Sequence, residues 1–438
     1  MLPGIKAMRS VSVPNTSKSI SVLGLFVILG LTSSSAFSGN IAIESETVLR
    51  TFNRSTAGGT SSQVAPVYEY LKLDVEELGL KELSFHVYGW GRFDAADSGY
   101  YGKRSDGSLL YGYLEYADAY QDMSLRLGRQ HIFEGVADNA IDGLRVRSDI
   151  GDQFSISGYG GLPVATADSL HPGGDIIWGG RLAHRMEAFS DVGVSYKRIG
   201  DNGKTISSLV GIDSAFFLPM DMSLHGNSVR NIETAGWAEH NYELQIRTGD
   251  FTISPIFELF EYNHYFGDMA PAAGPFLSLA HSDEKLQVIG VNGDWRWSKN
   301  WTLGARAKAY KYEVNDAAQY VSASVSWFGK GLAGAGGEVG YMKGGAADNN
   351  YLLTRLFFSL DGLGDDIWVD SIGMDLLYTL YKQDIYGKNS SYCISICSGK
   401  KLDDNLELKL SADYSVDPYF KSDIRAMVAL AYRFGADF

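Results

Sequence analysis

The sequence predicts an all-β protein that forms a single transmembrane antiparallel β-barrel of about 18 strands, within a range of 16 to 20. Three observations lead to this expectation. Apolar and polar residues alternate in short segments from about residue 66 onward, turn residues separate these segments, and Trp and Tyr residues collect near their ends. Segments of roughly 10 residues with one apolar and one polar face suit a barrel that meets lipid outside and water inside.

The alternation is clearest in the last segment of the chain. Ile424 and Val428 lie on an apolar face, and Arg425 and Arg433 lie on the opposite face. With the aromatic residue at the end, Phe438, this segment resembles the closing strand of bacterial outer-membrane barrels. A soluble edge strand would show the same pattern, so the expectation depends on its repetition along the chain.

The pattern does repeat, and the connections between the repeats differ in length. Alternating segments occur at 83–89, 125–128, 144–147, 178–183, 301–309, 321–327 and 406–413. Short turns are expected at 76–79, 148–152, 247–250 and 298–300, and long connections at 94–108, 160–175, 263–284 and 385–404. Short turns at one end and long loops at the other are typical of outer-membrane barrels. At roughly 20 residues per strand with its connection, and an even number of strands, we expect 18.

The beginning of the chain has the pattern of a secretory signal peptide. Basic residues precede an apolar segment at 21–31, and small residues follow up to Ser38. The apolar segment is too short to cross about 30 Å of hydrocarbon as a helix. We therefore expect residues 1–38 to be a signal peptide and residues 39–438 to be one barrel domain in the cell outer membrane of a Gram-negative bacterium.

The composition supports this class and excludes others. The chain has 438 residues with 50 Gly and 26 Tyr but only 10 Pro, and its formal net charge is −14. Abundant Gly and Tyr with short alternating segments indicate β structure. The negative charge argues against a nucleic-acid partner. The expected surroundings are outer-membrane lipid and dissolved solutes.

The two cysteines, Cys393 and Cys397, lie in a polar segment that resembles a loop, residues 389–399. An exported protein meets an oxidising compartment, so we expect a small loop disulfide between them. The alternative is a redox or metal role. No His lies near them, and two ligands do not make a zinc site. The chain has no C-x-x-C-H motif for haem attachment. We expect no metal and no cofactor.

Basic residues on the polar faces of neighbouring segments are the candidate site. A charge that faced lipid at mid-depth would cost about 2–4 kcal/mol, so these residues are expected in the lumen. They are Arg126, Arg145, Arg147, Arg181, Arg185, Arg306 and Lys308. Guanidinium groups bind carboxylates and phosphates through paired hydrogen bonds, so such a wall would favour small or polymeric anionic solutes. In the alternative interpretation they pair with lumen acids and only stiffen the interior. Candidate partners are Glu115, Glu258, Glu338 and Asp413.

Two families of barrels resemble this chain. Residues 125–130 (LRLGRQ) and 142–146 (DGLRV) resemble a strand–loop–strand pattern of the alginate-export porins. That resemblance implies a lumen that conducts an acidic polysaccharide, with Arg126 and Arg145 on its wall. The architecture also resembles the porin of porin–cytochrome conduits, in which a haem-free barrel sheathes a multihaem cytochrome. A periplasmic or multihaem cytochrome partner is therefore an alternative.

An enzyme is not expected. The eight His residues form no H-E-x-x-H motif, and the chain has no G-x-S-x-G elbow. A hydrolase built on a barrel remains an alternative. The sequence as a whole predicts an outer-membrane porin, a channel that passes solutes or an anionic polymer through a water-filled lumen.

Overall fold

The computed structural model describes residues 39–56, 61–96, 101–118, 122–164, 174–186, 189–266, 284–314, 316–329, 333–345, 350–363 and 368–437. The expected signal peptide, residues 1–38, lies outside these ranges. Within them, no helix has both the length and the apolar character needed to cross a membrane.

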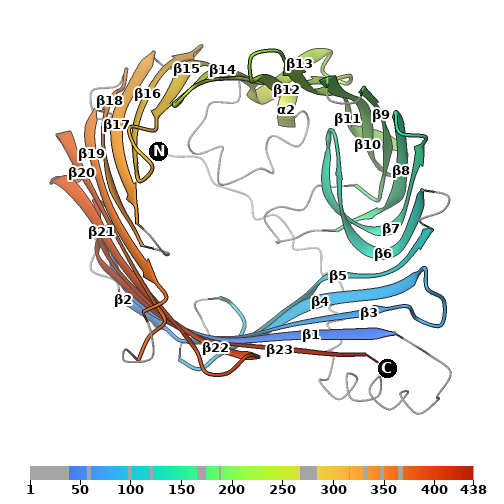
Figure 1. The fold of residues 1–438 in the computed structure, drawn as a ribbon, viewed down its shortest axis with the longest axis horizontal. Coiled ribbons are helices and arrows are strands. Elements are labelled where there is room, and N and C mark those ends of the chain that lie inside the picture. Colours follow the sequence, from blue (N-terminus) through green and yellow to red (C-terminus); the bar gives the residue numbers. More distant parts are fainter. Residues whose placement is uncertain are drawn as a thin grey trace, which may run out of the picture.

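The described chain forms one antiparallel sheet that closes on itself (Figure 1). Except for β2, each strand from β3 onward pairs with the next along the chain, and β1 closes the ring by pairing with both β3 and β23. The strands are β1 (Asn40–Thr56), β2 (Ser61–Val64), β3 (Pro66–Glu76), β4 (Leu83–Asp94), β5 (Ser105–Asp118), β6 (Met123–Glu134), β7 (Ala137–Ile150), β8 (Phe154–Pro163), β9 (Ile176–Met186), β10 (Ser190–Asp201), β11 (Lys204–Leu218), β12 (Met222–Asn231), β13 (Gly236–Thr248), β14 (Phe251–Glu261), β15 (Lys285–Trp295), β16 (Trp301–Tyr312), β17 (Ala318–Phe328), β18 (Gly334–Lys343), β19 (Tyr351–Asp361), β20 (Ser371–Ile385), β21 (Lys388–Lys401), β22 (Leu406–Val416) and β23 (Phe420–Asp437). A short helix, α2 (Tyr262–Phe266), follows β14.

Within the described chain the barrel has 22 strands, so the expected number of 18 is wrong. The additional strand, β2, pairs with β1 alone and continues the register of β3. The estimate failed because many connections are shorter than assumed. Residues 385–404, expected as a long connection, instead contain most of β21, which a tight turn at Tyr386 and Gly387 joins to β20. Both turn residues have positive φ, which a two-residue hairpin of type I′ requires.

The two ends of the barrel differ. The end that holds the start of β1 and the end of β23 is here called the terminal rim, and its turns are mostly short, as at 151–153 and 249–250. The opposite rim carries the longer connections at 95–104, 164–175 and 262–284. Short turns face the periplasm and long loops face outward in outer-membrane barrels, so the terminal rim is assigned to the periplasm.

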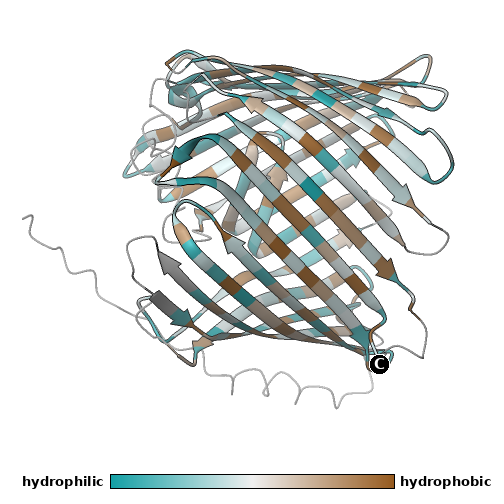
Figure 2. Ribbon diagram, turned by 90° about the vertical axis from the view of Figure 1, so that its left-hand side faces the viewer, coloured by the Kyte–Doolittle hydropathy of each residue, from teal (hydrophilic) through white to brown (hydrophobic). Residues whose placement is uncertain are grey.

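Apolar and polar residues alternate along the strands (Figure 2), and register places apolar residues on the outer surface of the barrel. Ile156, Leu182, Val194 and Ile212 face one another in turn across β8 to β11 and form one continuous row. Each of these side chains is about half exposed. A soluble protein rarely exposes so long a row of apolar side chains to water, whereas lipid would cover the row in a membrane. Near the terminal rim, Trp295, Trp301 and Trp327 share this outer face and match the expected interfacial girdle.

One tryptophan departs from the expected girdle. Trp90 lies opposite Tyr70 and packs 6.0 Å from Tyr68, ring centroid to ring centroid. These rings share their face with Lys72 and Asp74, which lie on the lumen side. Trp90 therefore contributes to the lumen wall.

Candidate functional site

Contacts that skip a strand identify the inner face of the barrel, because inward side chains converge on the concave side. Arg181 on β9 donates from Nε to Asp213 Oδ1 on β11 at 3.1 Å, across β10. Lys308 on β16 reaches Glu258 on β14 at 3.4 Å, across β15. Register then places the other predicted basic residues on this face: Arg126 lies opposite Arg145, while Arg147 and Arg181 both lie opposite Ser157.

Six of the seven basic residues are paired with carboxylates. The pairs are Arg126 with Glu115 (2.8 Å), Arg145 with Glu134, Arg147 with Asp149 (3.3 Å), Arg181 with Asp213 and Asp191, Arg185 with Asp191 (3.4 Å), and Lys308 with Glu258 (3.4 Å). Among the described residues, Arg306 alone of the seven forms no ion pair, and it donates from Nε to Asn292 Oδ1 at 3.2 Å. Glu115 and Glu258 are thus partners of the kind that the structural interpretation anticipates, whereas Glu338 accepts a hydrogen bond from Tyr320.

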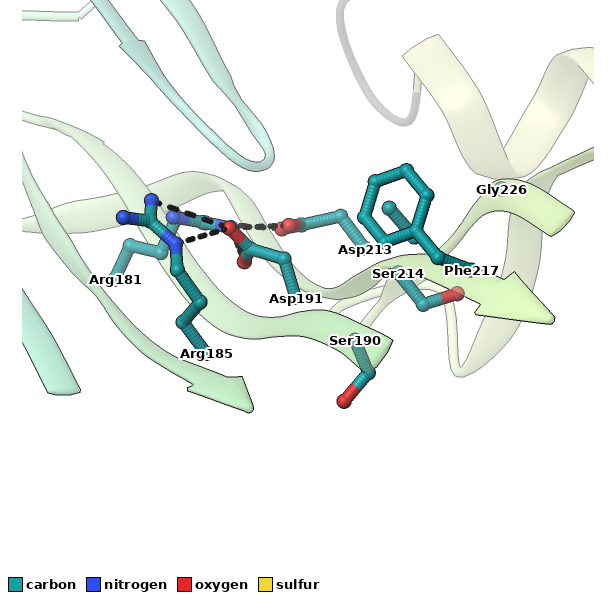
Figure 3. A pocket seen from close by; sticks show the side chains of 9 residues that line it. Arg181, Arg185, Ser190, Asp191, Asp213, Ser214, Phe217 and Gly226 are labelled. Atoms are coloured by element: carbon teal, nitrogen blue, oxygen red, sulfur yellow. Dashed lines mark hydrogen bonds and ion pairs between the residues drawn. The ribbon is translucent and has the colours of Figure 1, made fainter. Parts of the chain in front are cut away.

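A recess of about 430 Å³ opens beside part of this network (Figure 3). Arg181 and Arg185 both form ion pairs with Asp191, and Asp213 pairs with the Arg181 guanidinium from its other side. Phe217 lies beyond Asp213 along the same recess. Because both guanidinium groups already face carboxylates, the recess is a polar part of the wall and no vacant anion site.

An aromatic patch covers the lumen side of β3, β4 and β5, and the sequence prediction missed it. Its rings lie 5.6–6.0 Å apart in neighbouring pairs, a range typical of favourable aromatic packing. Guanidinium groups of Arg50 and Arg126 lie 5.3 and 5.1 Å from the ring centroids of Tyr68 and Tyr113. The signal in the sequence is a repeated aromatic spacing of two residues. The members of the patch are Tyr68, Tyr70, Tyr88, Trp90, Tyr111 and Tyr113.

A second part of the lumen wall, here called the small-residue wall, carries many small inward residues. On β16 to β18 and β20 to β22 the inward positions include Gly304, Ser322, Ser324, Gly336, Gly340, Gly373, Ser395 and Ser411. The lumen therefore has one part of its wall covered by aromatic side chains and another in which small hydroxyl-bearing and glycine positions alternate with charged residues such as Arg306 and Glu338.

Both cysteines belong to this small-residue wall, and the expected disulfide is wrong. Cys393 and Cys397 lie in β21, and both thiols are free. Four residues of extended strand span about 13 Å, whereas a disulfide needs Cα atoms within about 7 Å. Cys397 lies opposite Ser411, and the intervening Ile396 is exposed on the outer face. Both thiols therefore face the lumen.

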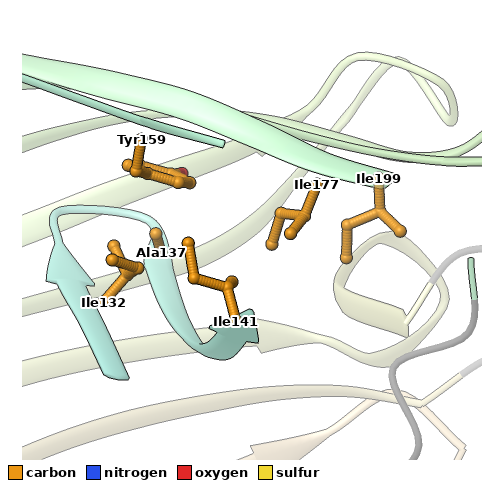
Figure 4. Close-up of a cluster of buried hydrophobic side chains, with 6 residues drawn as sticks. All are labelled: Ile132, Ala137, Ile141, Tyr159, Ile177 and Ile199. Atoms are coloured by element: carbon orange, nitrogen blue, oxygen red, sulfur yellow. The ribbon is translucent and has the colours of Figure 1, made fainter. Parts of the chain in front are cut away.

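The tip of the β6–β7 hairpin folds into the lumen and rests on the inner wall (Figure 1). The Val136 amide donates to Ser195 Oγ on β10 at 3.0 Å, and Lys197 Nζ donates to Asn139 Oδ1 at 3.1 Å. Ile132, Ala137 and Ile141 on the hairpin pack against the wall in a cluster whose members are at most 6% exposed (Figure 4). Burial of each large apolar side chain contributes about 1.5–3 kcal/mol, so this packing holds the hairpin in place. The wall side of the cluster consists of Tyr159, Ile177 and Ile199.

The other face of the hairpin is open to the lumen. Arg129 and Asp142 form a bidentate pair at 2.7 and 2.8 Å, and His131 bonds Asp138 at 2.6 Å. Phe133 stacks on His131 and is 73% exposed. The hairpin narrows the lumen and presents these polar and aromatic groups to whatever enters it.

A chain of three side chains near the terminal rim has the order of a hydrolase triad. The His86 ring contacts Ser84 Oγ through Nε2 at 2.9 Å and Asp74 Oδ1 through Nδ1 at 2.6 Å. Ser84 lies in the paired part of β4, where backbone amides serve the sheet, so no oxyanion hole accompanies it. Lys72 also pairs with Asp74, at 2.8 Å, which makes the group part of the lumen charge network.

Within the part of the chain that the structure describes, no group of three or more His, Cys, Asp or Glu residues is placed to hold a metal ion.

Comparison with known proteins finds similar barrels but no family. The P pilus usher (PapC) translocation pore aligns with a TM-score of 0.48 and 11% identity, over 90% of this chain and 99% of that one. OccAB1 of Acinetobacter baumannii gives 0.43 and 10%, over 92% and 98%. The outer membrane protein opdK of Pseudomonas aeruginosa gives 0.45 and 10%, over 91% and 99%. No family model and no curated protein matches the sequence.

Scores below 0.5 at such identities do not establish a shared function. The barrel itself supports the location: its strands pair around a closed antiparallel ring, and its outer face is apolar with tryptophans near one rim. The protein is a transmembrane β-barrel of the outer membrane.

Proposed function

We propose that the protein is an outer-membrane channel that passes dissolved solutes through its lumen. The observation that carries this proposal is the contrast between the two faces of the sheet, apolar outside and lined with ion pairs, hydroxyl groups and tyrosines inside. Barrels of 16 to 18 strands already leave an aqueous channel, and a ring of 22 strands is wider. The β6–β7 hairpin narrows this space, and the exposed side chains on its open face support a lumen that holds water.

The proposed channel should select for anions more weakly than a channel whose wall carried unpaired arginines. The carboxylate partners neutralise most of the basic residues, so their summed field is small. Preference for anions, including an acidic polymer, then depends on unpaired groups such as Arg306. The aromatic patch favours solutes that combine polar groups with a flat apolar face, because such a face packs on a tyrosine ring.

Planar-bilayer recording of the purified protein tests the channel proposal. We expect stable conductance steps with only modest preference between anions and cations in a salt gradient. A protein that inserts as a heat-modifiable barrel and conducts no ions would contradict the proposal. Such a result would favour the alternative function, in which the barrel sheathes a cytochrome that fills the lumen.

The hydrolase alternative has one observation in its favour, the Ser84–His86–Asp74 chain. A fluorophosphonate probe, which labels activated serines, distinguishes it from a structural network. We expect no labelling of Ser84, because an activated serine without oxyanion donors loses a factor of about 10²–10³ in rate. Labelling that Ser84→Ala removes would instead assign a nucleophile to the lumen.

A further inference from the structure

The wall of the barrel splits between β5 and β6. The two strands pair from Asp118 and Met123 up to Gly112 and Arg129, and the ladder stops there. Both strands continue: β5 stays in the wall, paired with β4 up to Ser105, whereas β6 runs on to Glu134 inside the lumen. The split is here called the β5–β6 seam.

Glycines at the base of the seam permit the bend. Gly128 has φ of 130°, in the range that residues with a side chain rarely adopt, and a Cβ atom there would lie 2.3 Å from the carbonyl oxygen of Gly112. Its partner across the hairpin, Gly143, would place a Cβ atom 2.2 Å from the carbonyl oxygen of Gly160. A side chain at either position would push the hairpin away from its neighbours.

The inward position of the hairpin is fixed by packing and charge, so the seam is a built feature of the wall. Arg145 donates from Nε to Glu134 Oε1 at 2.8 Å, and Ser157 Oγ donates to the other oxygen of Glu134 at 2.8 Å. Glu134 is 5% exposed. A buried carboxylate with these partners holds the end of β6 against β8, because separating them would leave a charge without a partner.

Among the residues that the structure describes, the seam leaves the edge of β5 without a neighbouring strand above Gly112. The Leu109 carbonyl accepts a hydrogen bond from Arg129 Nη1 at 3.1 Å, which replaces one lost ladder bond. Lipid tails cannot hydrogen-bond the rest of such an edge, and open edges in a membrane persist only where they line water or protein. The edge of β5 must therefore face water or protein at the seam.

The side chains around the seam change from polar to apolar between the lumen and the lipid. Arg129, which bonds the Leu109 carbonyl across the seam, and its partner Asp142 lie at the seam, and Phe133 projects from the open face of the hairpin. Leu109 on β5 and Leu127 on β6 flank the seam, Leu162 on β8 lies opposite Asp142, and they are 37%, 55% and 59% exposed.

We propose that the β5–β6 seam is a lateral opening that admits an acyl-chain amphiphile between the lumen and the outward-facing leaflet. The polar head of the amphiphile lies by Arg129, Asp142 and His131, and its chain extends past Leu109 and Leu162 into the bilayer. A second route, sideways into lipid, thus joins the aqueous path of the proposed channel. This inference does not depend on ion conduction, so either can fail without the other.

Photo-crosslinking in vesicles tests the seam directly. The photoreactive residue p-benzoylphenylalanine replaces Phe133, and the protein is reconstituted into tritiated phosphatidylcholine and irradiated. The same replacement of Leu144, which faces lipid, is the positive control, and that of Ser322, on the closed small-residue wall of the lumen, is the negative control. We expect lipid adducts at positions 133 and 144 and none at 322. An adduct at 144 without one at 133 overturns the proposal, as do equal adducts at 133 and 322.

Hydrogen exchange on the unmodified protein gives a second measure that needs no variant. Between Ser105 and Tyr111, the amides of β5 that point away from β4 should exchange faster than those of Val87 and Tyr88, which have strands on both sides. Equal protection of the two groups would mean that the seam is closed in the membrane, and the lateral opening would then be refuted.

Discussion

Glu134 and Arg145 form a buried ion pair across the β6–β7 hairpin, with side chains only 6% and 14% exposed. The pair joins the tip of a hairpin that has left the barrel wall to the part of β7 that remains in it. It thereby connects the ordinary ladder of the barrel to the segment that narrows the lumen.

Arg145→Met should release the hairpin tip, because it leaves the Glu134 carboxylate buried without its cation. Breaking a buried pair in this way costs about 3–5 kcal/mol. A local cost of that size corresponds to a loss of protection on the order of a hundredfold or more at the Val136 amide, which bonds Ser195. Arg185→Met is the matched control, because Arg185 is 65% exposed and its pair contributes at most about 1 kcal/mol. Unchanged protection at Val136 in Arg145→Met would show that the apolar cluster alone holds the hairpin.

Part of this arrangement follows from the sequence, and the reason lies in the range of each interaction. Alternation is a local pattern, and it predicted the last strand and an inward side for Arg126, Arg145 and Arg181. The partners of these residues depend on register between strands. Asp213, for example, lies 32 residues from Arg181 and two strands away. No local pattern specifies such a neighbour.

The errors have equally specific causes. Residues 385–404 are rich in Ser, Lys and Asp, which suggested a loop, yet Ile394 and Ile396 alternate with the cysteines and mark a strand. The β6–β7 hairpin alternates as regularly as any wall strand, so its inward bend was not visible. Only the paired glycines at 128 and 143 distinguish it, and glycine is common throughout this chain.

The two free thiols provide a test of the lumen. A membrane-impermeant methanethiosulfonate should modify Cys397 in the folded, unreduced protein, because its side chain faces the small-residue wall and is exposed. Modification should lower the conductance, and Cys397→Ser should prevent this effect. In a background with both cysteines replaced by Ser, Ile396→Cys should resist the same reagent, since position 396 faces lipid. Labelling of 396 and not of 397 would reverse the assigned faces of β21.

Arg306 should contribute more to ion preference than any of the paired basic residues, because no carboxylate within the described residues neutralises it. Arg306→Glu should shift the reversal potential in a salt gradient toward cations, with a change in permeability ratio on the order of twofold at 0.1 M salt, where charges act over about 10 Å. The shift should shrink near 1 M, where screening shortens that range to about 3 Å.

Arg296→Glu is the control for this measurement. It changes the net charge by the same amount at an exposed turn of the terminal rim, outside the lumen face. An equal shift from both variants would attribute ion preference to the overall charge of the protein. No shift of the reversal potential in either variant would mean that the conducted ions do not pass near the wall at β16.

The assignment of the two faces can be tested at neighbouring positions of one strand. Ala323 and Ser324 are adjacent in β17, with Ala323 on the face that carries Val321 and Val325 and Ser324 opposite Glu338 on the lumen side. Ala323→Arg should destabilise the folded barrel by about 2–4 kcal/mol, because the guanidinium would face lipid near mid-depth. Ser324→Arg introduces the same side chain one residue away, where it contacts water and the Glu338 carboxylate. This variant should leave the free energy of unfolding nearly unchanged. Reversible urea unfolding in lipid vesicles measures both free energies, with heat-modifiable migration as the check on folding. Equal losses in the two variants would mean that lumen and lipid faces do not differ at β17, and the assignment of every inward residue on β16 to β18 would have to be withdrawn.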